Sequence, residues 1–419
     1  MLGLPRSMSM NERLAYVSFD RVPSPKGAAI HIREFVRSLG RRLGGVDLVT
    51  PSAEARTIEA DRDRWPGVDH YQLPADGRDL IQRVMNFRRA LAQFFRERRR
   101  LVHFRSIFEG YPIAMHRERT ADCLIYEVNG LPSIELKYHH PDVADDRELL
   151  TKLRHQEDVC LAAADRIVTP SAVTASYLIE RGAAPDKVTV IPNGVDTGLF
   201  SYAEPARWRS IRPQEPLRML YSGTLSPWQG IRHALDALSL YNRDAAAQLT
   251  IIGPTRGHQR RQLEEWCRQE DLRDSVELLP PMSQRELAMA HHDHDVIIAP
   301  LLSNDRNTVQ GCCPLKVLEA MASGVPLIAS DLPVVRALAR DDQEALLVRP
   351  GSGKAIKDAM FRLDREPSLA ARIAAAARRR ANKQFTWKQS CEQLVAVYEE
   401  ALAATSPSSA RSSDASASG

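Results

Sequence analysis

A lysine and a glutamate three residues apart, Lys316 and Glu319, stand where a helix should begin. Pro314 favours the first turn of a helix that would run to about Ser323 and stop at Gly324. The amino end of a helix offers free N–H groups and the positive end of the helix dipole, which together suit a phosphate. A cation such as Lys316 is disfavoured there unless an anion is bound, and Glu319 lies on nearly the same face, within reach of a sugar or ribose hydroxyl. The alternative is a surface lysine and glutamate on an ordinary helix.

Four polar side chains lie where two strand candidates end in the first half of the chain. His103 and Arg105 come at the end of Leu101–Phe104, and Glu127 and Asn129 end the next central strand. Ligands of parallel α/β sheets bind at the carboxyl ends of the strands. These residues are therefore placed to line a cleft, where Glu127 or His103 would exchange a proton with an acceptor hydroxyl. The alternative is that both are buried structural side chains.

Three other patterns resemble sites but fit them poorly. His291-His-Asp-His-Asp295 could place two histidines on one helix face as metal ligands, although a solvated helix end is the favoured interpretation. Gly351-Ser-Gly-Lys354 lacks the earlier glycine and the following Ser or Thr of a Walker phosphate loop. The sequence has no G-x-G-x-x-G, which weighs against a nicotinamide dehydrogenase, and its six cysteines form no CxxC pair. We therefore expect no metal site.

The composition is that of a soluble globular protein. Its 419 residues suffice for two or three domains with cores of their own, and 43% hydrophobic with 26% charged residues excludes a disordered or fibrous chain. A net charge of +4 gives no general case for nucleic-acid binding. No apolar run approaches the length of a membrane span, and Met1 to Arg6 lack the apolar stretch of a secretory signal. These features predict a cytoplasmic protein with reduced thiols.

One segment is locally basic. Arg83 to Arg105 contains eight arginines and one acid, Glu97, and apolar residues recur within it at helical spacing, at Val84, Phe87, Leu91 and Phe94. A surface helix with a solvated basic face is the favoured interpretation. The alternative is a surface that docks on anionic lipid at the inner face of a membrane, which would suit a lipid-linked or membrane-proximal acceptor.

These residues must be positioned by an alternating series of short β-branched runs, which predict strands, and segments long enough to form helices. In the first half, strands are predicted at Leu14–Phe19, Val46–Thr50, Leu101–Phe104, Leu124–Val128, Arg166–Thr169 and Val188–Ile191. A helix with Ile30, Phe35, Val36 and Leu39 buried should follow the first of them and end near Gly44. After a stretch rich in Pro and Arg, Pro205 to Pro216, the series restarts with strands at Met219–Tyr221, Leu249–Ile252, Val276–Leu279, Val296–Ala299, Val325–Ala329 and Ala345–Val348.

Two α/β halves of similar size predict two Rossmann-like, doubly wound domains that face each other across a cleft. Each would have a parallel sheet covered by helices on both faces. The stretch from Pro205 to Pro216 is predicted to be the linker between them. The last fifteen residues, 405–419, hold seven serines and are predicted to be a disordered tail.

The residues around Lys316 resemble the donor-binding signature of the family 4 glycosyltransferases. The likeness covers Pro314 to Ala322 and continues from Gly324 to Asp331. Five further segments match the family in the same order: Lys26-Gly27, Ile191 to Asp196, Tyr221 to Gly230, Ile251 to Pro254 and Phe385 to Trp387. The resemblance therefore spans most of the chain and is carried by the ordered series of motifs.

The resemblance implies a GT-B fold and transfer of a sugar from a nucleoside diphosphate sugar, with retention at the anomeric carbon. It implies no metal ion and no cofactor besides that co-substrate, because the helix end and basic side chains would stabilise the departing diphosphate. Lys316 would pair with the diphosphate and Glu319 would hold the ribose. The donor would also lie against Gly27, Gly223, Thr224, Gln229, Gly253, Cys312, Cys313 and Leu315.

With Lys316, the strand-end residues His103, Glu127 and Asn129 make up the predicted catalytic set. The acceptor would be a carbohydrate, a glycolipid or a small molecule, and nucleic acid is not an expected partner. By analogy with the family, residues 1–204 form the acceptor-side domain and 205–384 the donor-binding domain. Residues 385–404 would form a helix that crosses back to the first domain.

Three positions depart from the family's usual pattern. The first of two glutamates normally eight positions apart is Gly311, which implies a different recognition of the donor sugar. The usual Arg–Lys pair of the second-domain loop appears as Thr224 and Gln229, and a histidine often found after the central strand appears as Asn129. We interpret these as differences between branches of the family, one of which has a similar Pro-Leu-Lys signature.

These departures leave Lys316 as the main cation at the donor site, with Arg232 or Arg306 as candidate helpers. They also keep two other functions open. One is a GT-B sugar-nucleotide epimerase, which would turn over the donor without an acceptor. The other is a non-catalytic GT-B protein that binds a nucleotide or a carbohydrate.

Overall fold

The computed structural model describes residues 12–24, 26–201 and 215–405. The chain forms two compact units, one built from the residues up to Pro170, Thr174–Ile191 and the chain from Cys391 onward, the other from Ser171–Val173 and Pro192–Ser390. The predicted boundary at 204/205, most of the predicted linker and all but the first residue of the predicted tail lie outside the described residues. Among the described helices, none has the length and apolar character needed to cross a bilayer.

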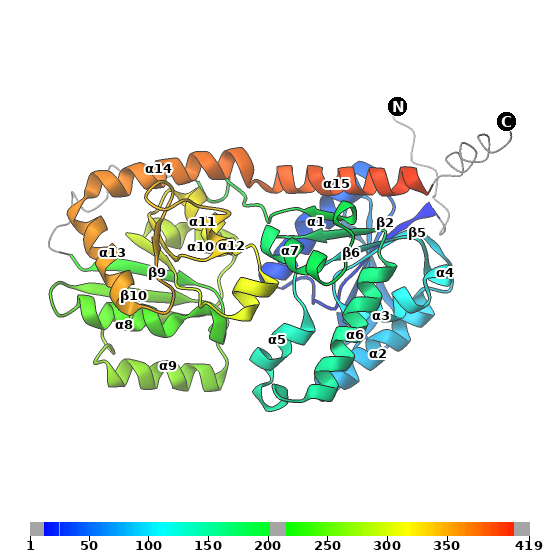
Figure 1. Ribbon diagram of the computed structural model, residues 1–419, viewed down its shortest axis with the longest axis horizontal. Helices are drawn as coiled ribbons and strands as arrows, with labels where there is room; N and C mark the ends of the chain where they lie inside the picture. Colours follow the sequence, from blue (N-terminus) through cyan, green and yellow to red (C-terminus); the bar gives the residue numbers. More distant parts are fainter. Residues whose placement is uncertain (1–11, 25, 202–214, 406–419) are drawn as a thin grey trace. The chain divides into compact units, whose positions relative to one another are not determined.

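The first unit is built on an eight-stranded sheet with the order β3-β4-β2-β1-β5-β6-β7-β8. Figure 1 labels β2, β5 and β6 of this sheet. All neighbouring strands are parallel except β3 and β4, which are antiparallel. The strands are β1 (Leu14–Val17), β2 (Val46–Ser52), β3 (Glu59–Trp65), β4 (Val68–Pro74), β5 (Arg99–Phe104), β6 (Ala121–Glu127), β7 (Arg166–Thr169) and β8 (Val188–Val190).

The hairpin of β3 and β4 has no counterpart in the sequence-based prediction. β3 has the sequence Glu-Ala-Asp-Arg-Asp-Arg-Trp, in which charged residues occupy both faces, so it lacks the alternation that marks a strand. It forms because the turn at Pro66-Gly67 returns the chain onto β4, and Gly67 takes a φ of +73° that favours glycine. As the edge strand of the sheet, β3 tolerates this charge.

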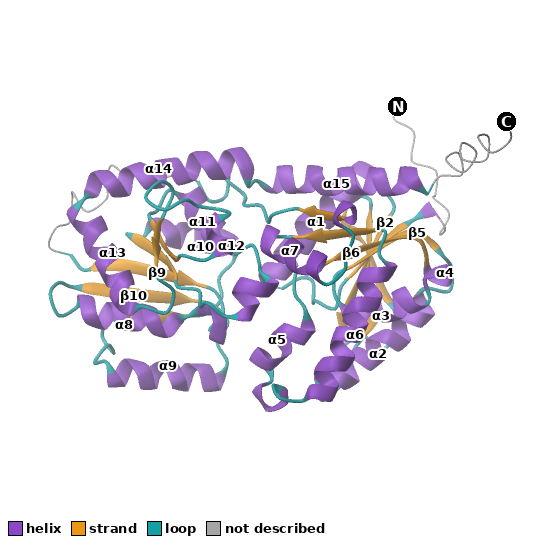
Figure 2. Ribbon diagram, viewed as in Figure 1, coloured by secondary structure: helices purple, strands orange, loops and turns teal. Residues whose placement is uncertain are grey.

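Helices cover both faces of the first sheet (Figure 2). They are α1 (Gly27–Leu43), α2 (Leu80–Phe94), α3 (Ile107–Met115), α4 (Arg117–Thr120), α5 (Pro132–His139), α6 (Arg147–Ala163) and α7 (Ala172–Glu180). The predicted apolar positions of α1 are buried against the sheet, as their spacing requires.

The basic segment Arg83 to Arg105 is divided between α2 and β5, so the prediction of one surface helix with a solvated basic face holds only in part. Arg99 is fully buried on β5, beside Asp47, and Arg105 is 6% exposed. Arg88 on α2 donates to the carbonyl oxygens of Ile107 and Phe108. These three arginines are structural, because buried guanidinium groups need fixed acceptors.

The second unit is built on a six-stranded parallel sheet with the order β11-β10-β9-β12-β13-β14. Its strands are β9 (Leu217–Ser222), β10 (Ala247–Ile252), β11 (Val276–Leu279), β12 (Val296–Ala299), β13 (Leu327–Ser330) and β14 (Leu346–Val348). Its helices are α8 (Ile231–Tyr241), α9 (Gly257–Gln269), α10 (Gln284–His292), α11 (Leu315–Ser323), α12 (Pro333–Arg336), α13 (Gly353–Arg365) and α14 (Pro367–Gln384).

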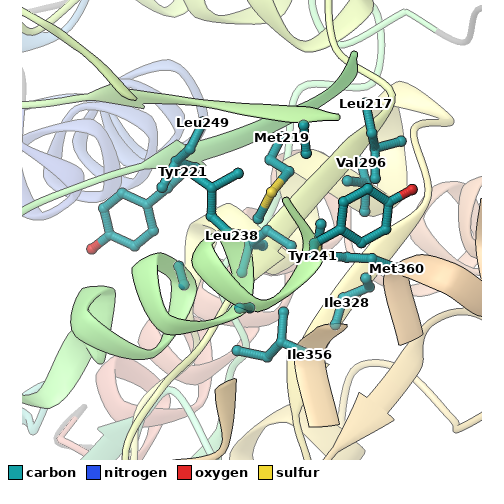
Figure 3. Packing of buried hydrophobic residues seen from close by; sticks show 14 of the residues in the cluster. Leu217, Met219, Tyr221, Leu238, Tyr241, Leu249, Val296, Ile328, Ile356 and Met360 are labelled. Carbon is teal, nitrogen blue, oxygen red and sulfur yellow. The ribbon is translucent and has the colours of Figure 1, made fainter. Parts of the chain in front are cut away.

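The core of the second unit lies between the sheet and the helices α8 and α13. Figure 3 shows Met219, Leu249 and Val296 of the strands facing Leu238 of α8 and Met360 of α13. This arrangement agrees with the strong apolar periodicity of both helices and leaves the opposite face of the sheet to α11. Every predicted strand of either half overlaps a strand of the structure.

The last helix, α15, runs from Trp387 to Ala404. Its first residues belong to the second unit and its residues from Cys391 onward to the first. Within the first unit, the Cys391 thiol donates to the carbonyl oxygen of Glu34, and the hydroxyl of Tyr398 lies 2.9 Å from Nδ1 of His103.

Candidate active site

The helix that carries Lys316 begins and ends almost as predicted. α11 runs from Leu315 to Ser323 and stops at Gly324, whose φ of +75° favours glycine. Pro314 is the residue just before the helix rather than part of its first turn. The first turn contains no acidic residue, so nothing within it offsets the positive end of the dipole.

Lys316 is buried, with 8% of its surface exposed, which rules out the ordinary surface lysine. Its ammonium nitrogen donates to Oε1 of Gln229 at 2.8 Å and lies 3.8 Å from the centre of the Tyr221 ring. A Cβ on Gly223 would lie 3.1 Å from that nitrogen, so this glycine gives the ammonium group its room. Amide oxygen and aromatic face stabilise a cation only weakly compared with a carboxylate.

Burial lowers the pKa of Lys316 to about 7, and the opposing effects of Glu319 and Cys312 do not restore it. The Glu319 carboxyl is also buried, at 6% exposed, and burial raises its pKa. It accepts a hydrogen bond from Nε2 of Gln284 at 3.2 Å. The site thus contains a lysine that is only partly charged near neutrality, at a helix end that attracts anions.

The predicted donor contacts of the second unit gather around this lysine at the carboxyl ends of β9 and β10. A Cβ on Gly253 would overlap the carbonyl oxygen of Gly223, so the two glycines let these strand ends come close. The carbonyl oxygen of Thr224 accepts from the hydroxyl of Tyr221 at 2.5 Å. Gly223 and Thr224 belong to the loop after β9, which reaches Gln229, and Gly253 follows β10.

The residues just before α11 complete this group. Cys312 is half-buried and Cys313 buried. The carbonyl oxygen of Cys313 accepts from the Asn193 side chain at 2.7 Å, and Leu315 is the first residue of the helix. Gly27 is the first residue of α1 and belongs to the first unit.

Of the two candidate helper cations, Arg306 is the one that lies against a residue next to Gln229. Arg232 forms ion pairs with Asp236 at 2.8 Å and with Glu270 at 2.5 Å, so two carboxylates already neutralise it. Arg306 lies over the ring of Trp228, the residue next to Gln229, with 5.2 Å from its central carbon to the ring centre. It begins a single turn of π-helix, Arg306–Gln310, a feature that is frequent near functional sites.

Three contact residues of this site were not predicted as such. Tyr221 lies within a recognised motif, but its position at an apolar strand end indicates a core residue. Asn193 also lies within a recognised motif, Ile191 to Asp196, whereas Gln284 carries no local signal. Only the folded chain brings these two residues to Cys313 and Glu319.

In the first unit, the predicted strand-end residues meet at the Glu127 carboxylate. His103 is 0% and Glu127 1% exposed, and Nε2 of His103 lies 2.9 Å from Oε2 of Glu127. Arg105 donates to Oε1 of Glu127 at 3.1 Å and to Asp20 at 2.7 Å. Asn129 is half-buried and donates to the same Oε1. This burial favours structural roles for His103 and Glu127 over proton exchange with an acceptor.

The other sequence patterns lie elsewhere. His291 is fully buried against the ring of Phe200, and burial lowers its pKa to about 3, so the interpretation as a solvated helix end is wrong for this residue. Asp295 accepts from the backbone N–H of Arg218 at 2.8 Å. Ser352 begins α13 as its N-cap. Within the described ranges, no three His, Cys, Asp or Glu side chains are grouped as a metal would require.

Comparison with known proteins identifies the family. The family described as "Glycosyltransferase Family 4" matches residues 25–199, and that described as "Glycosyl transferases group 1" matches residues 203–380. The chain is 28% identical over 279 residues to a D-inositol 3-phosphate glycosyltransferase of Stackebrandtia nassauensis, covering 64% of this chain and 61% of that protein. The protein of the same name from Geodermatophilus obscurus is 28% identical over 398 residues, 92% of this chain and 83% of that one.

Solved structures show the same fold. Sucrose-phosphate synthase from Thermosynechococcus elongatus matches with a TM-score of 0.78 and 20% identity, over 94% of this chain and all of that one. HepE from Anabaena in complex with UDP-glucose matches with a TM-score of 0.71 and 15% identity, over 93% and 99% of the two chains. The chain therefore belongs to the family 4 glycosyltransferases and has the GT-B fold.

The buried state of Lys316 predicts that binding of a nucleoside diphosphate sugar takes up a proton. An anion beside the ammonium group raises its pKa from about 7. Below pH 6 the lysine is already charged, so affinity there should be constant. Above pH 7 the affinity should fall, by up to tenfold per pH unit. Calorimetry at pH 8 in two buffers of different ionisation enthalpy should detect nearly one proton bound, and binding without proton uptake would contradict this assignment.

Proposed function

We propose that this protein transfers a sugar from a nucleoside diphosphate sugar to an acceptor hydroxyl, with retention and without a metal ion. The observation that carries the proposal is the buried Lys316 at the amino end of α11. A helix end, a buried cation and a neighbouring carboxylate, Glu319, suit a diphosphate and the ribose attached to it.

The catalytic part of the proposal concerns the leaving group. As the bond to the sugar breaks, negative charge develops on the diphosphate, where the first-turn N–H groups of α11 and Lys316 stabilise it most. Arg306, which lies over the ring of Trp228, would add a second positive charge beside the loop that contains Gln229. Fixed charges of this kind can supply the stabilisation that a divalent cation would otherwise give to a departing phosphate.

The comparisons support the donor class and suggest where to look for the acceptor. HepE, a structural neighbour, has been solved in complex with UDP-glucose, and several relatives are named for D-inositol 3-phosphate. Another relative is named as an MMP alpha-(1->4)-mannosyltransferase. We therefore place polyol phosphates first among the candidate acceptors, ahead of other carbohydrates and of glycolipids.

The first test is donor binding. Thermal unfolding should be followed with UDP, GDP, ADP and their common sugars. A ligand at 100 times its Kd adds about 2.7 kcal/mol, which raises the unfolding midpoint of a unit of this size by several degrees. Lys316→Ala should abolish the shift.

Lys354→Ala is the matched control for this test, because Lys354 is also the second residue of its helix but is exposed and paired with Asp358. It should leave the shift intact. Equal shifts in all three proteins would mean that the diphosphate binds elsewhere.

The second test is transfer itself. With the donor so identified, an acceptor screen should yield a product whose anomeric configuration, read by NMR, is that of the donor. A chelator should leave the rate unchanged, whereas loss of activity on chelation would overturn the metal-free mechanism. Isomerised donor in the absence of any acceptor would indicate an epimerase instead, and binding without turnover would indicate a binding protein.

We further propose peripheral contact with an anionic membrane, made by the outer face of α2. Ile81 is 71% and Met85 44% exposed, one helical turn apart, and Arg78 and Arg89 are exposed beside them. Cosedimentation with vesicles that contain an anionic phospholipid should be several-fold stronger than with neutral vesicles. It should weaken in an Ile81→Ser, Met85→Ser double variant. Equal binding to both vesicle types would contradict this contact.

A further inference from the structure

Glu127 is the centre of a buried polar cluster in the first unit. Its Oε2 atom lies 2.6 Å from the hydroxyl of Tyr16 and 2.9 Å from Nε2 of His103. Its Oε1 atom lies 2.7 Å from Nε2 of His31 and 3.1 Å from Nε of Arg105, and it also accepts from Nδ2 of Asn129. Donors from β1, α1, β5 and the loop after β6 therefore converge on one side chain.

The carboxylate in this cluster is ionised. Burial alone would raise the pKa of Glu127, but His31, Arg105 and His103 together hold it well below its ordinary value. An ionised carboxylate can only accept, so the nitrogen of each histidine that faces it must carry a hydrogen. His103 therefore accepts at Nδ1 from the hydroxyl of Tyr398, since burial lowers the pKa of His103 and keeps the ring neutral.

The same reasoning fixes the side-chain amide of Asn129. Its Nδ2 faces Oε1 of Glu127, and only the nitrogen of an amide can donate to a carboxylate. The amide oxygen must then point away from Glu127. Asn129 is the half-buried member of the pair, whereas Glu127 is 1% exposed. Besides the second hydrogen of Nδ2, the pair can therefore offer a ligand the carbonyl oxygen of Asn129, which is the only acceptor atom of that amide.

We propose that Glu127 is a positioning residue that holds Asn129 with its amide oxygen toward the ligand, so that the site accepts a hydrogen bond from a sugar hydroxyl. The inference rests on the proposed function, because it takes Asn129 to face donor or acceptor. Glu127 itself touches no reacting atom. It acts through Asn129, and the network through Tyr16, His31 and Arg105 keeps it ionised and fixed.

A double-mutant cycle tests the dependence on Asn129. Glu127→Gln keeps the shape of the side chain, but its amide can also donate, so Asn129 is free to turn. Turnover should fall roughly tenfold or more in Glu127→Gln and in Asn129→Ala, with donor Kd little changed. In the double variant the loss should equal that of Asn129→Ala alone. Additive losses would overturn the proposal.

Glu157→Gln is the matched control, because Glu157 is a fully buried carboxylate of the same unit that accepts from Ser133 and Arg181. It removes a buried charge at another place and should leave turnover unchanged. A loss as large as that of Glu127→Gln would show that any lost buried charge impairs this unit, which would overturn the specific role.

Two further measurements do not depend on a stable Glu127 variant or on a known acceptor. Asn129→Asp keeps an oxygen but cannot donate to Glu127, so it should be as impaired as Asn129→Ala, and wild-type activity in it would contradict the proposal. In protein labelled with ¹⁵N at asparagine, one side-chain amide proton of Asn129 should be shifted far downfield by the carboxylate. An unshifted proton in the wild type would refute the geometry even if transfer were never detected.

Discussion

A cation buried at the positive end of a helix is the constraint on which the second unit depends. Lys316 sits at the amino end of α11, where both burial and the dipole oppose its charge, and its nearest partners are an amide oxygen and an aromatic ring. In a site of this kind an anionic ligand supplies the negative charge that these partners of the ammonium group lack. The neighbouring features leave room for such a ligand. The glycines at the ends of β9 and β10 open the space, and Glu319 lies one turn further along α11.

The first unit shows the opposite arrangement. Glu127 is an anion that is buried even more deeply than Lys316, but donors from several elements satisfy it. Such a cluster gains nothing from an added ion, because a further charge would break bonds already made. The value of this cluster is that it is rigid and can hold neighbouring residues in place. It fixes the position of Asn129 just after the carboxyl end of β6, and the bond from Arg105 to Asp20 fixes the loop after β1.

Most of the fold and the position of the Lys316 helix could be predicted from the sequence, because the residue patterns that indicate them are local. The predicted strands overlap strands of both sheets, and the apolar spacing of α1 identifies its buried face. Pro314 with Gly324 brackets α11 to within a residue. The rest depends on long-range contacts. The charged strand β3 forms only through its partner, and Gln284 reaches Glu319 from another helix. The hydrogen-bond network of Glu127 could not be predicted either, because spacing locates a residue at a strand end but does not reveal how many donors surround it.

The most direct test of the central claim is a crystal structure of the complex with a nucleoside diphosphate. We predict phosphate oxygens within hydrogen-bond distance of the Lys316 ammonium nitrogen and of the first N–H groups of α11, with the bond from Lys316 to Gln229 broken or shared. A diphosphate bound at another helix end, with Lys316 still held by Gln229 and the ring of Tyr221, would contradict the account.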